Sequence, residues 1–315
     1  MKNILMILSI LIIVYAPFVG QINLQVENIF DESSVDYKIF FDIRVPRVIL
    51  AFFVGAILSL SGLVFQTIFR NPMSTPFTLG VASGATLFSA IGILLGLSVF
   101  ISIFAFLGAV VTIIVLFAVS SRFKTYETSS LLLVGIALSF FYSASLMIAF
   151  FVSDLQENYE IVRFTMGSLD VVGFNEVYLV VLAGIFLYGL ITSHNHHIKL
   201  LLTSHEFAYL KGMNVKKTNY TLLLGVSVAV GVSVSVAGPI GFVGLIIPHI
   251  IKNIMRKSAE KLILPIFFYG GVFLVLCDVI ARNLGSASDV PIGVITAFIG
   301  TPFFIYLIIT RKRQN

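Results

Sequence analysis

Two charged residues stand inside one long apolar stretch of the sequence, where charge is costly and needs an explanation. Asp278 is the only acid away from the ends of the predicted spans, and Arg282 follows it by four residues. This spacing puts both side chains on one face of a helix, so they can form an ion pair. Acids inside a membrane are functional candidates by default, and a proton relay through Asp278 is the alternative.

Arginines also mark the start of another apolar stretch. Arg44 and Arg47 flank Pro46, and Arg282 is predicted to end its own helix on the same side of the membrane. A guanidinium is always charged and binds carboxylates in bidentate fashion. The three arginines therefore suit a partner protein that presents acidic residues. The alternative is that they snorkel to lipid phosphates.

No motif for nucleotide or metal chemistry is complete in this chain. The Gly-x-x-x-x-Gly-Lys-Ser/Thr loop that holds ATP phosphates does not occur. Cys277 is the single cysteine, which excludes a disulfide framework and a cysteine-based metal site. His194, His196 and His197 have no carboxylate or cysteine nearby in sequence, so metal binding is not predicted. We expect no catalytic residue, no metal and no cofactor in this chain.

Composition places these residues in a membrane protein. Of 315 residues, 58% are hydrophobic and only 11% are charged, whereas about a quarter are charged in a soluble domain. No long polar stretch remains for a separate soluble domain, so residues 1–315 are expected to form one membrane domain. The segment 4–15 resembles a signal peptide, but Pro17 stands where cleavage would fall, which favours a first membrane anchor.

Ten stretches are apolar and long enough for spanning helices, which need about 20 residues each. They cover residues 4–20, 46–66, 78–98, 100–120, 128–152, 173–193, 218–237, 240–256, 262–282 and 291–310. Gly238 and Pro239 split one apolar stretch into two of them. Ala51, Gly55 and Ser59 form a stripe of small residues at helical spacing, which is typical of close helix packing.

The distribution of basic residues predicts the orientation. An even number of spans puts both ends on one side; with the ends in the cytoplasm, the inner segments are 1–3, 67–77, 121–127, 194–217, 252–261 and 311–315. They hold every basic residue except Lys38, Arg44, Arg47, Arg163 and Arg282, that is, 15 of 20. This bias obeys the positive-inside rule. The net charge of +5 is thereby assigned to the membrane surface, and no nucleic acid is implied.

The longest inner segment, 194–217, contains a candidate short helix. Glu206, Ala208 and Leu210 lie within it, and Gly212 is placed to close it. A soluble partner could grip such a helix and move the spans, although a passive connector is the alternative.

Several ordered motifs resemble the FecCD-type permease family, the membrane subunits of ATP-driven importers for iron-siderophore, haem and cobalamin. They are RVPR at 44–47, VGA at 54–56, LSG at 60–62, QTIFRNP at 66–72, LGVASGA at 79–85, MGSL at 166–169, GPIGFVGLIIPH at 238–249, CDVIAR at 277–282, PIGVIT at 291–296 and IGTPFF at 299–304. They spread over residues 44–310, which covers most of the chain.

The resemblance implies an all-α integral membrane permease of the type II ABC importer architecture. Ten transmembrane helices with cytoplasmic termini agree with the count above. The implied partners are a second permease copy or a paralogue, two cytoplasmic ATPase subunits that bind ATP and magnesium, and a periplasmic or lipid-anchored substrate-binding protein. The location would be the bacterial cytoplasmic membrane, among lipids.

The resemblance also implies roles for residues. It assigns docking of the binding protein to Arg44, Arg47 and Arg282, and coupling to the ATPase to a helix in 205–214. The coupling residues would be His205, Glu206, Ala208, Leu210, Lys211 and Gly212, within a segment of about 200–217. Motif residues with structural roles would be Asn71, Pro72, Gly80, Gly84, Gly238, Gly241, Gly244, Pro248, His249, Pro291, Gly293, Gly300 and Pro302.

Two positions depart from the family pattern. Lys211 replaces a frequent leucine before the coupling glycine, and Asp289-Val-Pro291 replaces Glu-Leu-Pro. Arg163 receives no role. A ferric siderophore is the first expectation for the cargo, then haem, then cobalamin. A proton-coupled secondary transporter is the alternative from another class, while an intramembrane enzyme lacks a catalytic pair.

Overall fold

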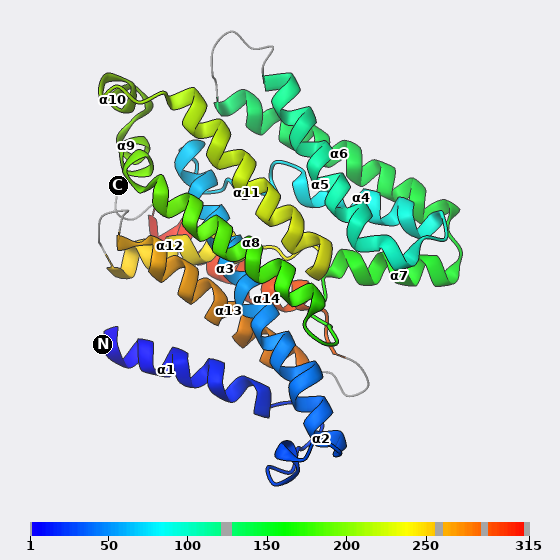
Figure 1. Ribbon diagram of the computed structural model, residues 1–315. Coiled ribbons are helices and arrows are strands. Elements are labelled where there is room, and N and C mark those ends of the chain that lie inside the picture. The colour runs from blue at the N-terminus through cyan, green and yellow to red at the C-terminus, as the bar shows by residue number, and fades with distance from the viewer. Residues whose placement is uncertain (1, 121–127, 256–260, 285–288, 312–315) are drawn as a thin grey trace.

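The computed structural model describes residues 2–120, 128–255, 261–284 and 289–311 (Figure 1). Within these ranges every regular element is a helix and none is a strand, which confirms the predicted all-helical class. The predicted inner segment 121–127 lies outside the described residues, as do half of 252–261 and most of 311–315.

The helices follow the apolar stretches of the sequence. Their bounds are α1 Lys2–Tyr15, α2 Val35–Lys38, α3 Val45–Ile68, α4 Val81–Leu94, α5 Ile101–Ser120, α6 Thr128–Val152, α7 Leu155–Met166, α8 Asn175–Ser193, α9 Asn195–Thr203, α10 His205–Leu210, α11 Val215–Ala237, α12 Val243–Met255, α13 Ile263–Leu284 and α14 Ile292–Arg311. A π-helical turn, η3 Ile39–Arg44, joins α2 to α3, and a 3-10 turn, η1 Ala16–Phe18, follows α1.

Six helical segments of the described chain are long and apolar enough to cross a membrane. They are Val35–Ile68, Ser98–Val119, Leu132–Val152, Asn175–Ser193, Val215–Ala237 and Ile263–Leu284. Shorter apolar helices cover Leu5–Phe18, Val81–Leu94, Val243–Met255 and Ile292–Ile305. These segments overlap the ten predicted stretches, but four of them are below the usual spanning length, so the ten-span count stays a prediction.

Helix α3 forms the centre of the molecule and packs against α8, α11, α12 and α13 (Figure 1). The contacts are close because glycines face each other. A Cβ added to Gly62 would overlap the carbonyl of Gly244 in α12, and one added to Gly55 would overlap that of Gly270 in α13. The stripe of small residues on α3 therefore serves helix packing, as its spacing predicts.

A second group of helices stands beside this centre. Helices α4, α5, α6 and α7 pack together on one side of the molecule, and α5 also contacts α11 (Figure 1). Helix α7 begins with a capping box, in which Asp154 accepts from the Glu157 amide and the Glu157 carboxylate accepts from the Asp154 amide. Helix α7 was not predicted, because it is too polar and too short to be a span.

The chain turns sharply between α11 and α12, where a break was expected. Gly238 has φ of +66°, and an added Cβ there would lie 2.6 Å from the Phe164 carbonyl oxygen. Only glycine adopts this conformation at low cost and fits the space. The split at residues 238–239 is confirmed.

Candidate functional site

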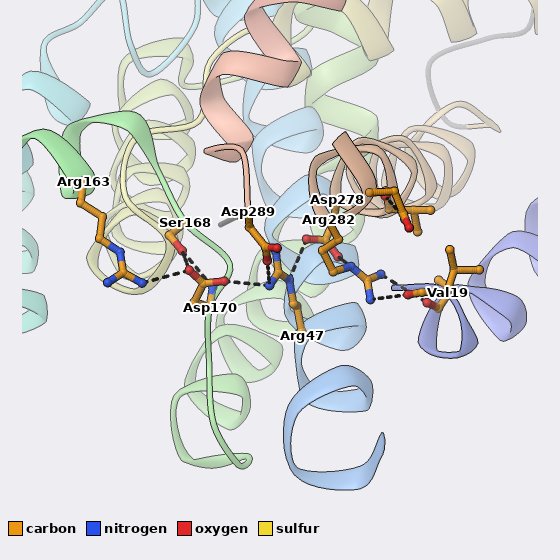
Figure 2. Close-up of polar contacts among 11 residues, drawn as sticks. Val19, Arg47, Arg163, Ser168, Asp170, Asp278, Arg282 and Asp289 are labelled. Atoms are coloured by element: carbon orange, nitrogen blue, oxygen red, sulfur yellow. Dashed lines mark hydrogen bonds and ion pairs between the residues drawn. The ribbon is translucent and has the colours of Figure 1, made fainter. Parts of the chain in front are cut away.

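Arg47, in the first turn of α3, lies at the centre of a group of ionic contacts (Figure 2). Its Nε donates to Asp278 Oδ1 over 2.8 Å, and its Nη1 donates to Asp170 Oδ1 over 2.7 Å and to Asp289 Oδ2 over 2.6 Å. The three carboxylates come from α13, from the loop after α7 and from the segment before α14. One guanidinium therefore joins four separate parts of the chain.

Asp278 and Arg282 approach each other within α13, as their spacing predicts. Arg282 Nε lies 3.0 Å from Asp278 Oδ2, an ion pair whose angles do not meet those of a hydrogen bond. Arg282 also donates to the carbonyls of Val19 at 3.0 Å and Ala16 at 3.3 Å. Asp278 has no exposed surface, so both of its oxygens face arginines in the protein interior.

Asp170 extends the contacts toward solvent. It accepts from Ser168 Oγ at 2.7 Å and from Arg163 Nη2 at 3.1 Å (Figure 2). Burial raises the pKa of Asp170, but the Ser168 hydrogen bond and the charges of Arg47 and Arg163 outweigh it, so the pKa lies below its usual range. Arg163, which the sequence left without a role, is thus an ionic partner of Asp170.

Six side chains form what we call the outer charge network, because it lies at the end of the molecule that the sequence predicts to face outward. They are Arg47, Arg163, Arg282, Asp170, Asp278 and Asp289. Three positive and three negative charges balance, which is how buried charge becomes tolerable. Removing one member of a buried pair costs more than forming the pair gains, because the remaining charge is left without a partner.

Arg44 contacts backbone instead of carboxylates. Its guanidinium donates to the carbonyls of Pro17, Phe18 and Ile22, which follow α1. All three arginines that were predicted to dock a partner are buried, with at most 8% of their surface exposed. They lie at the same end of the molecule, but they donate to groups within the chain. The docking role stays a prediction.

At the opposite end of the molecule, α10 forms the short helix expected in the inner segment (Figure 1). Ser204 caps it by accepting from the Phe207 amide at 2.8 Å, and Gly212 follows it with φ of +81°. Ala208 is buried, whereas Tyr209 and Leu210 are 74% and 81% exposed. The helix is therefore anchored on one side and presents apolar side chains on the other.

Contacts join α9 and α10 to the C-terminal end of α3. Arg70, just after α3, donates to the Thr203 carbonyl at 3.4 Å. Burial and the charge of Arg70 lower the pKa of His205, against a hydrogen bond with the backbone of Ile68. The exposed residues Glu206 and Lys211 flank the apolar face, and the Lys211 ammonium lies 5.7 Å from the centre of the Phe207 ring.

The motif residues mostly shape turns and close packing. Asn71 Oδ1 accepts from the Met73 amide at 2.9 Å in the loop that holds Pro72, and Gly80 precedes α4 with φ of +78°. Gly84 packs on Thr112, Gly293 on the Met166 carbonyl and Gly300 on the Phe242 ring. Of the rest, Gly238 and Gly241 lie in the turn before α12, Gly244, Pro248 and His249 in α12, Pro291 before α14, and Pro302 in α14.

Three histidines lie near one another where α8 meets α9: His194 precedes α9, and His196 and His197 lie in its first turn. The ring centres of His194 and His197 are 5.6 Å apart, and those of His196 and His197 are 6.3 Å apart. Burial and the neighbouring histidines lower the pKa of His197. In the ranges that the structure covers, no three His, Cys, Asp or Glu side chains are grouped to hold a metal ion.

A cavity of about 410 Å³ opens beside the outer charge network. It is lined by Glu160, Arg163, Ser168 and Asp170 among its polar residues and by Phe164 among the apolar ones. Sequence reasoning missed Asp170 and Asp289 as partners of Arg47. The only available signal was that each acid adjoins a family motif, MGSL and Val-Pro respectively.

Comparisons with known proteins agree with one another. The model of the FecCD transport family matches residues 5–310. The hemin transport system permease protein HmuU of Yersinia pestis is 32% identical over 330 aligned positions, covering 100% of this chain and 97% of that protein. An iron chelatin transport system permease protein of Helicobacter pylori is 38% identical, covering 93% of this chain and 90% of that protein.

A third relative and a solved structure extend this result. The vitamin B12 import system permease protein BtuC of Yersinia pseudotuberculosis is 33% identical, covering 93% of this chain and 88% of that protein. The structure of a metal-chelate type ABC transporter in an inward-facing conformation matches with a TM-score of 0.87 and 28% identity. That match covers 98% of this chain and all of the other.

Proposed function

The chain belongs to the FecCD transport family, and on that premise we propose that it carries a ferric siderophore across the bacterial cytoplasmic membrane. At the coarser level it is a multi-pass permease of an ABC importer of the metal-chelate, hemin or B12 type. Permease subunits are not enzymes, and a partner ATPase hydrolyses the ATP.

The proposed topology has ten spans with both termini in the cytoplasm. Six long apolar helices and four shorter ones among the described residues support the count. Fifteen of the 20 basic residues lie in the segments that this topology places inside, since only Lys38, Arg44, Arg47, Arg163 and Arg282 lie elsewhere. The topology puts α10 inside and the outer charge network outside.

The observation that carries the importer part of the proposal, as distinct from the choice of cargo, is the exposed apolar face of α10. Tyr209 and Leu210 project from a capped helix whose other side is buried through Ala208. Exposed large apolar side chains on an anchored cytoplasmic helix are what a partner subunit would bury. We assign this face to the ATPase, with His205, Glu206, Lys211 and Gly212 shaping and flanking it.

The energy of ATP would then reach the outer side through α3. Arg70 and His205 join the inner end of α3 to α10, and Arg47 holds its outer end in the charge network. A helix of 24 residues is about 36 Å long, so α3 alone reaches from the neighbourhood of α10 to the charge network. Movement of α10 on ATP binding would shift α3 as a rigid element and open or close the path.

Delivery of the chelate is assigned to a periplasmic or lipid-anchored binding protein. Arg44, Arg47 and Arg282 remain the proposed docking arginines. Because their donors are used within the chain, direct docking would require them to exchange these contacts for acidic residues of the partner. A second copy of this permease, or a paralogue, would complete the translocation path.

The relatives are named for different cargoes and do not rank them, so the order of cargoes remains our proposal. The Helicobacter pylori relative is named for iron chelatin transport, and the Yersinia pestis relative for hemin.

The alternative class, a proton-coupled carrier, relied on an isolated Asp278. In the structure Asp278 contacts Arg47 and Arg282, which supports a structural ion pair.

The test is uptake of radiolabelled ferric siderophore in cells, with permease variants compared at matched membrane levels. We expect Glu206→Ala/Gly212→Pro and Arg44→Glu/Arg47→Glu to lose uptake, as deletion of the partner ATPase should. Labelled haem and cobalamin form parallel arms, and uptake of either one alone would reassign the cargo. Uptake that persists without the ATPase and collapses with a protonophore would support the secondary carrier.

A further inference from the structure

An ordered segment projects beyond the outer ends of the helices. We call residues 22–36 the outer protrusion; α2 at its end lies at the tip of the molecule (Figure 1). Ser34 organises it by accepting from the Tyr37 amide at 3.0 Å and donating to the Asn28 carbonyl. Ile29 is 1% exposed and anchors it. The protrusion is thus a folded element with its own internal hydrogen bonds, and not an irregular linker.

The protrusion extends past the hydrocarbon layer. The continuous helical segment Val35–Ile68 has 34 residues, or about 50 Å at 1.5 Å per residue, whereas a bilayer core is about 30 Å thick. Charged Asp36 and Lys38 stand in α2, at one end of this segment, and charge is costly in the hydrocarbon layer, so the surplus length includes α2. Residues before α2 therefore lie in water or against another protein.

Large apolar side chains on the protrusion are left uncovered. Phe30 and Val35 are 79% and 71% exposed, and Ile22 and Val26 are exposed as well. A folded polar segment gains nothing by showing such side chains to water, and grouped exposed apolar residues mark interaction surfaces. A membrane surface and a protein are the two kinds of partner that would bury them.

Charge decides between the two partners. Residues 22–38 carry Glu27, Asp31, Glu32 and Asp36 against the single base Lys38. Hydrogen bonds from Ser33 keep the pKa of Asp31 below its usual range, so it stays ionised at neutral pH. Anionic lipid headgroups would be repelled by these carboxylates, whereas lysines and arginines around an apolar hollow on a protein would be attracted.

The base of the protrusion is held by two of the predicted docking arginines. Arg44 donates to the carbonyls of Pro17, Phe18 and Ile22, and Arg282 donates to those of Ala16 and Val19. These contacts fix the direction in which the chain leaves α1. The arginines can therefore influence docking without touching the partner.

We propose that the outer protrusion is itself a docking surface for the soluble chelate-delivery protein, which would bury Phe30 in an apolar hollow bordered by lysines or arginines. The inference rests on the proposed importer function. Arg44 and Arg282 then have a positioning role in addition to their proposed docking role, because they hold the protrusion in place. Glu27 and Glu32 would face the basic border, which lies apart from the acidic residues that the three arginines would meet.

The test uses the whole transporter in lipid nanodiscs, and as probe the purified soluble protein whose deletion abolishes chelate uptake by this permease. Glu27→Lys/Glu32→Lys spares Asp31 and Asp36, which hold the loop. We expect at least tenfold weaker binding, partial recovery with a probe whose border lysines are changed to glutamate, and an unchanged melting temperature. Glu176→Lys, at the exposed start of α8, is the matched control and should bind normally.

A second arm places an environment-sensitive fluorophore on Phe30→Cys. The native Cys277 is buried, so labelling is selective. We expect emission typical of water in the nanodisc alone and a blue shift when the probe is added. A blue shift without the probe would assign the surface to lipid and overturn the inference. Normal binding by the charge-reversed variant would also overturn the inference. If the native transporter takes up no chelate in an ATP-dependent way, that result would instead count against the proposed function.

Discussion

Arg47 donates through Nε to Oδ1 of Asp278 over 2.8 Å, although 231 residues separate the two along the chain. The contact joins α3 to α13 at a position where Asp278 has no exposed surface. A charge pair so placed fixes the relative position of two helices, because neither partner can be released without leaving a buried charge.

Asp278→Asn should therefore destabilise the protein strongly. Arg47 and Arg282 would lose their shared carboxylate, and breaking a buried pair in this way costs about 3–5 kcal/mol. The measurement is resistance of the purified protein to denaturation by SDS. Glu176→Gln, which changes an exposed carboxylate, should have little effect, and Arg47→Met/Asp278→Leu should recover part of the loss. Equal stability of Asp278→Asn and the native protein would contradict the network.

The pH dependence of stability should report on Asp170. Its folded pKa is depressed, so its contribution is present above the unfolded pKa of about 3.9 and is lost as pH falls through the folded value. The difference in melting temperature between native protein and Asp170→Asn should be constant from pH 7 to 5 and shrink below about pH 4. Ser168→Ala should move that fall to higher pH, since it removes one stabilising hydrogen bond. A difference that stays constant down to pH 3 would exclude this role.

Close packing of α3 makes Gly62 sensitive to one methyl group. Gly62→Ala would push a Cβ into the Gly244 carbonyl, and overpacking of this kind costs about 1–3 kcal/mol. Gly189 is the matched control, because it is also within a helix but has nothing within 4 Å of an added Cβ. Gly189→Ala should be neutral or stabilise by about 0.5–1 kcal/mol. Equal melting temperatures for the two variants would refute the packing argument.

The exposed face of α10 can be separated from stability. Tyr209→Ala/Leu210→Ala removes two side chains that make little contact within the chain, so the melting temperature should be retained. Loss of apolar anchors at an interface costs about 2 kcal/mol or more, and uptake and co-purification of the ATPase should fall at least tenfold.

The chain offers an unusually close control for this change. Tyr178 and Leu179 form the same dipeptide at the outer start of α8, where they are exposed as well. Tyr178→Ala/Leu179→Ala should leave ATPase binding intact. If both double variants reduce binding alike, the effect belongs to general damage and α10 loses its assigned role.

The sequence predicted features that depend on residues close together along the chain, but not contacts between residues far apart in it. Apolar runs of about 20 residues predicted where helices lie, because the bilayer sets that length. The i, i+4 spacing of Asp278 and Arg282 predicted a shared face. The partners of Arg47 could not be found in this way, since Asp170 and Asp289 lie 123 and 242 residues away in loops, where no periodicity links them to α3.

The predicted docking arginines show what the local sequence leaves out. Their positions at helix ends and their breach of the charge rule suggested a surface role. Burial is decided by neighbouring backbone, however, and the carbonyls after α1 lie close enough to accept from Arg44 and Arg282. Nothing in the local sequence of residues 16–22 marks them as acceptors.

The contacts of Arg282 with Ala16 and Val19 span 266 and 263 residues, and they affect the order of assembly. Helix α1 is synthesised well before α13, yet two of the hydrogen bonds that secure its end need Arg282 of α13. During synthesis, α1 would lie in the bilayer without the hydrogen bonds from Arg282 until α13 has been inserted. In a truncated chain that stops before α13, residues 16–22 after α1 should therefore be cleaved more readily by protease. Protease resistance at residues 16–22 would then report when the fold is complete.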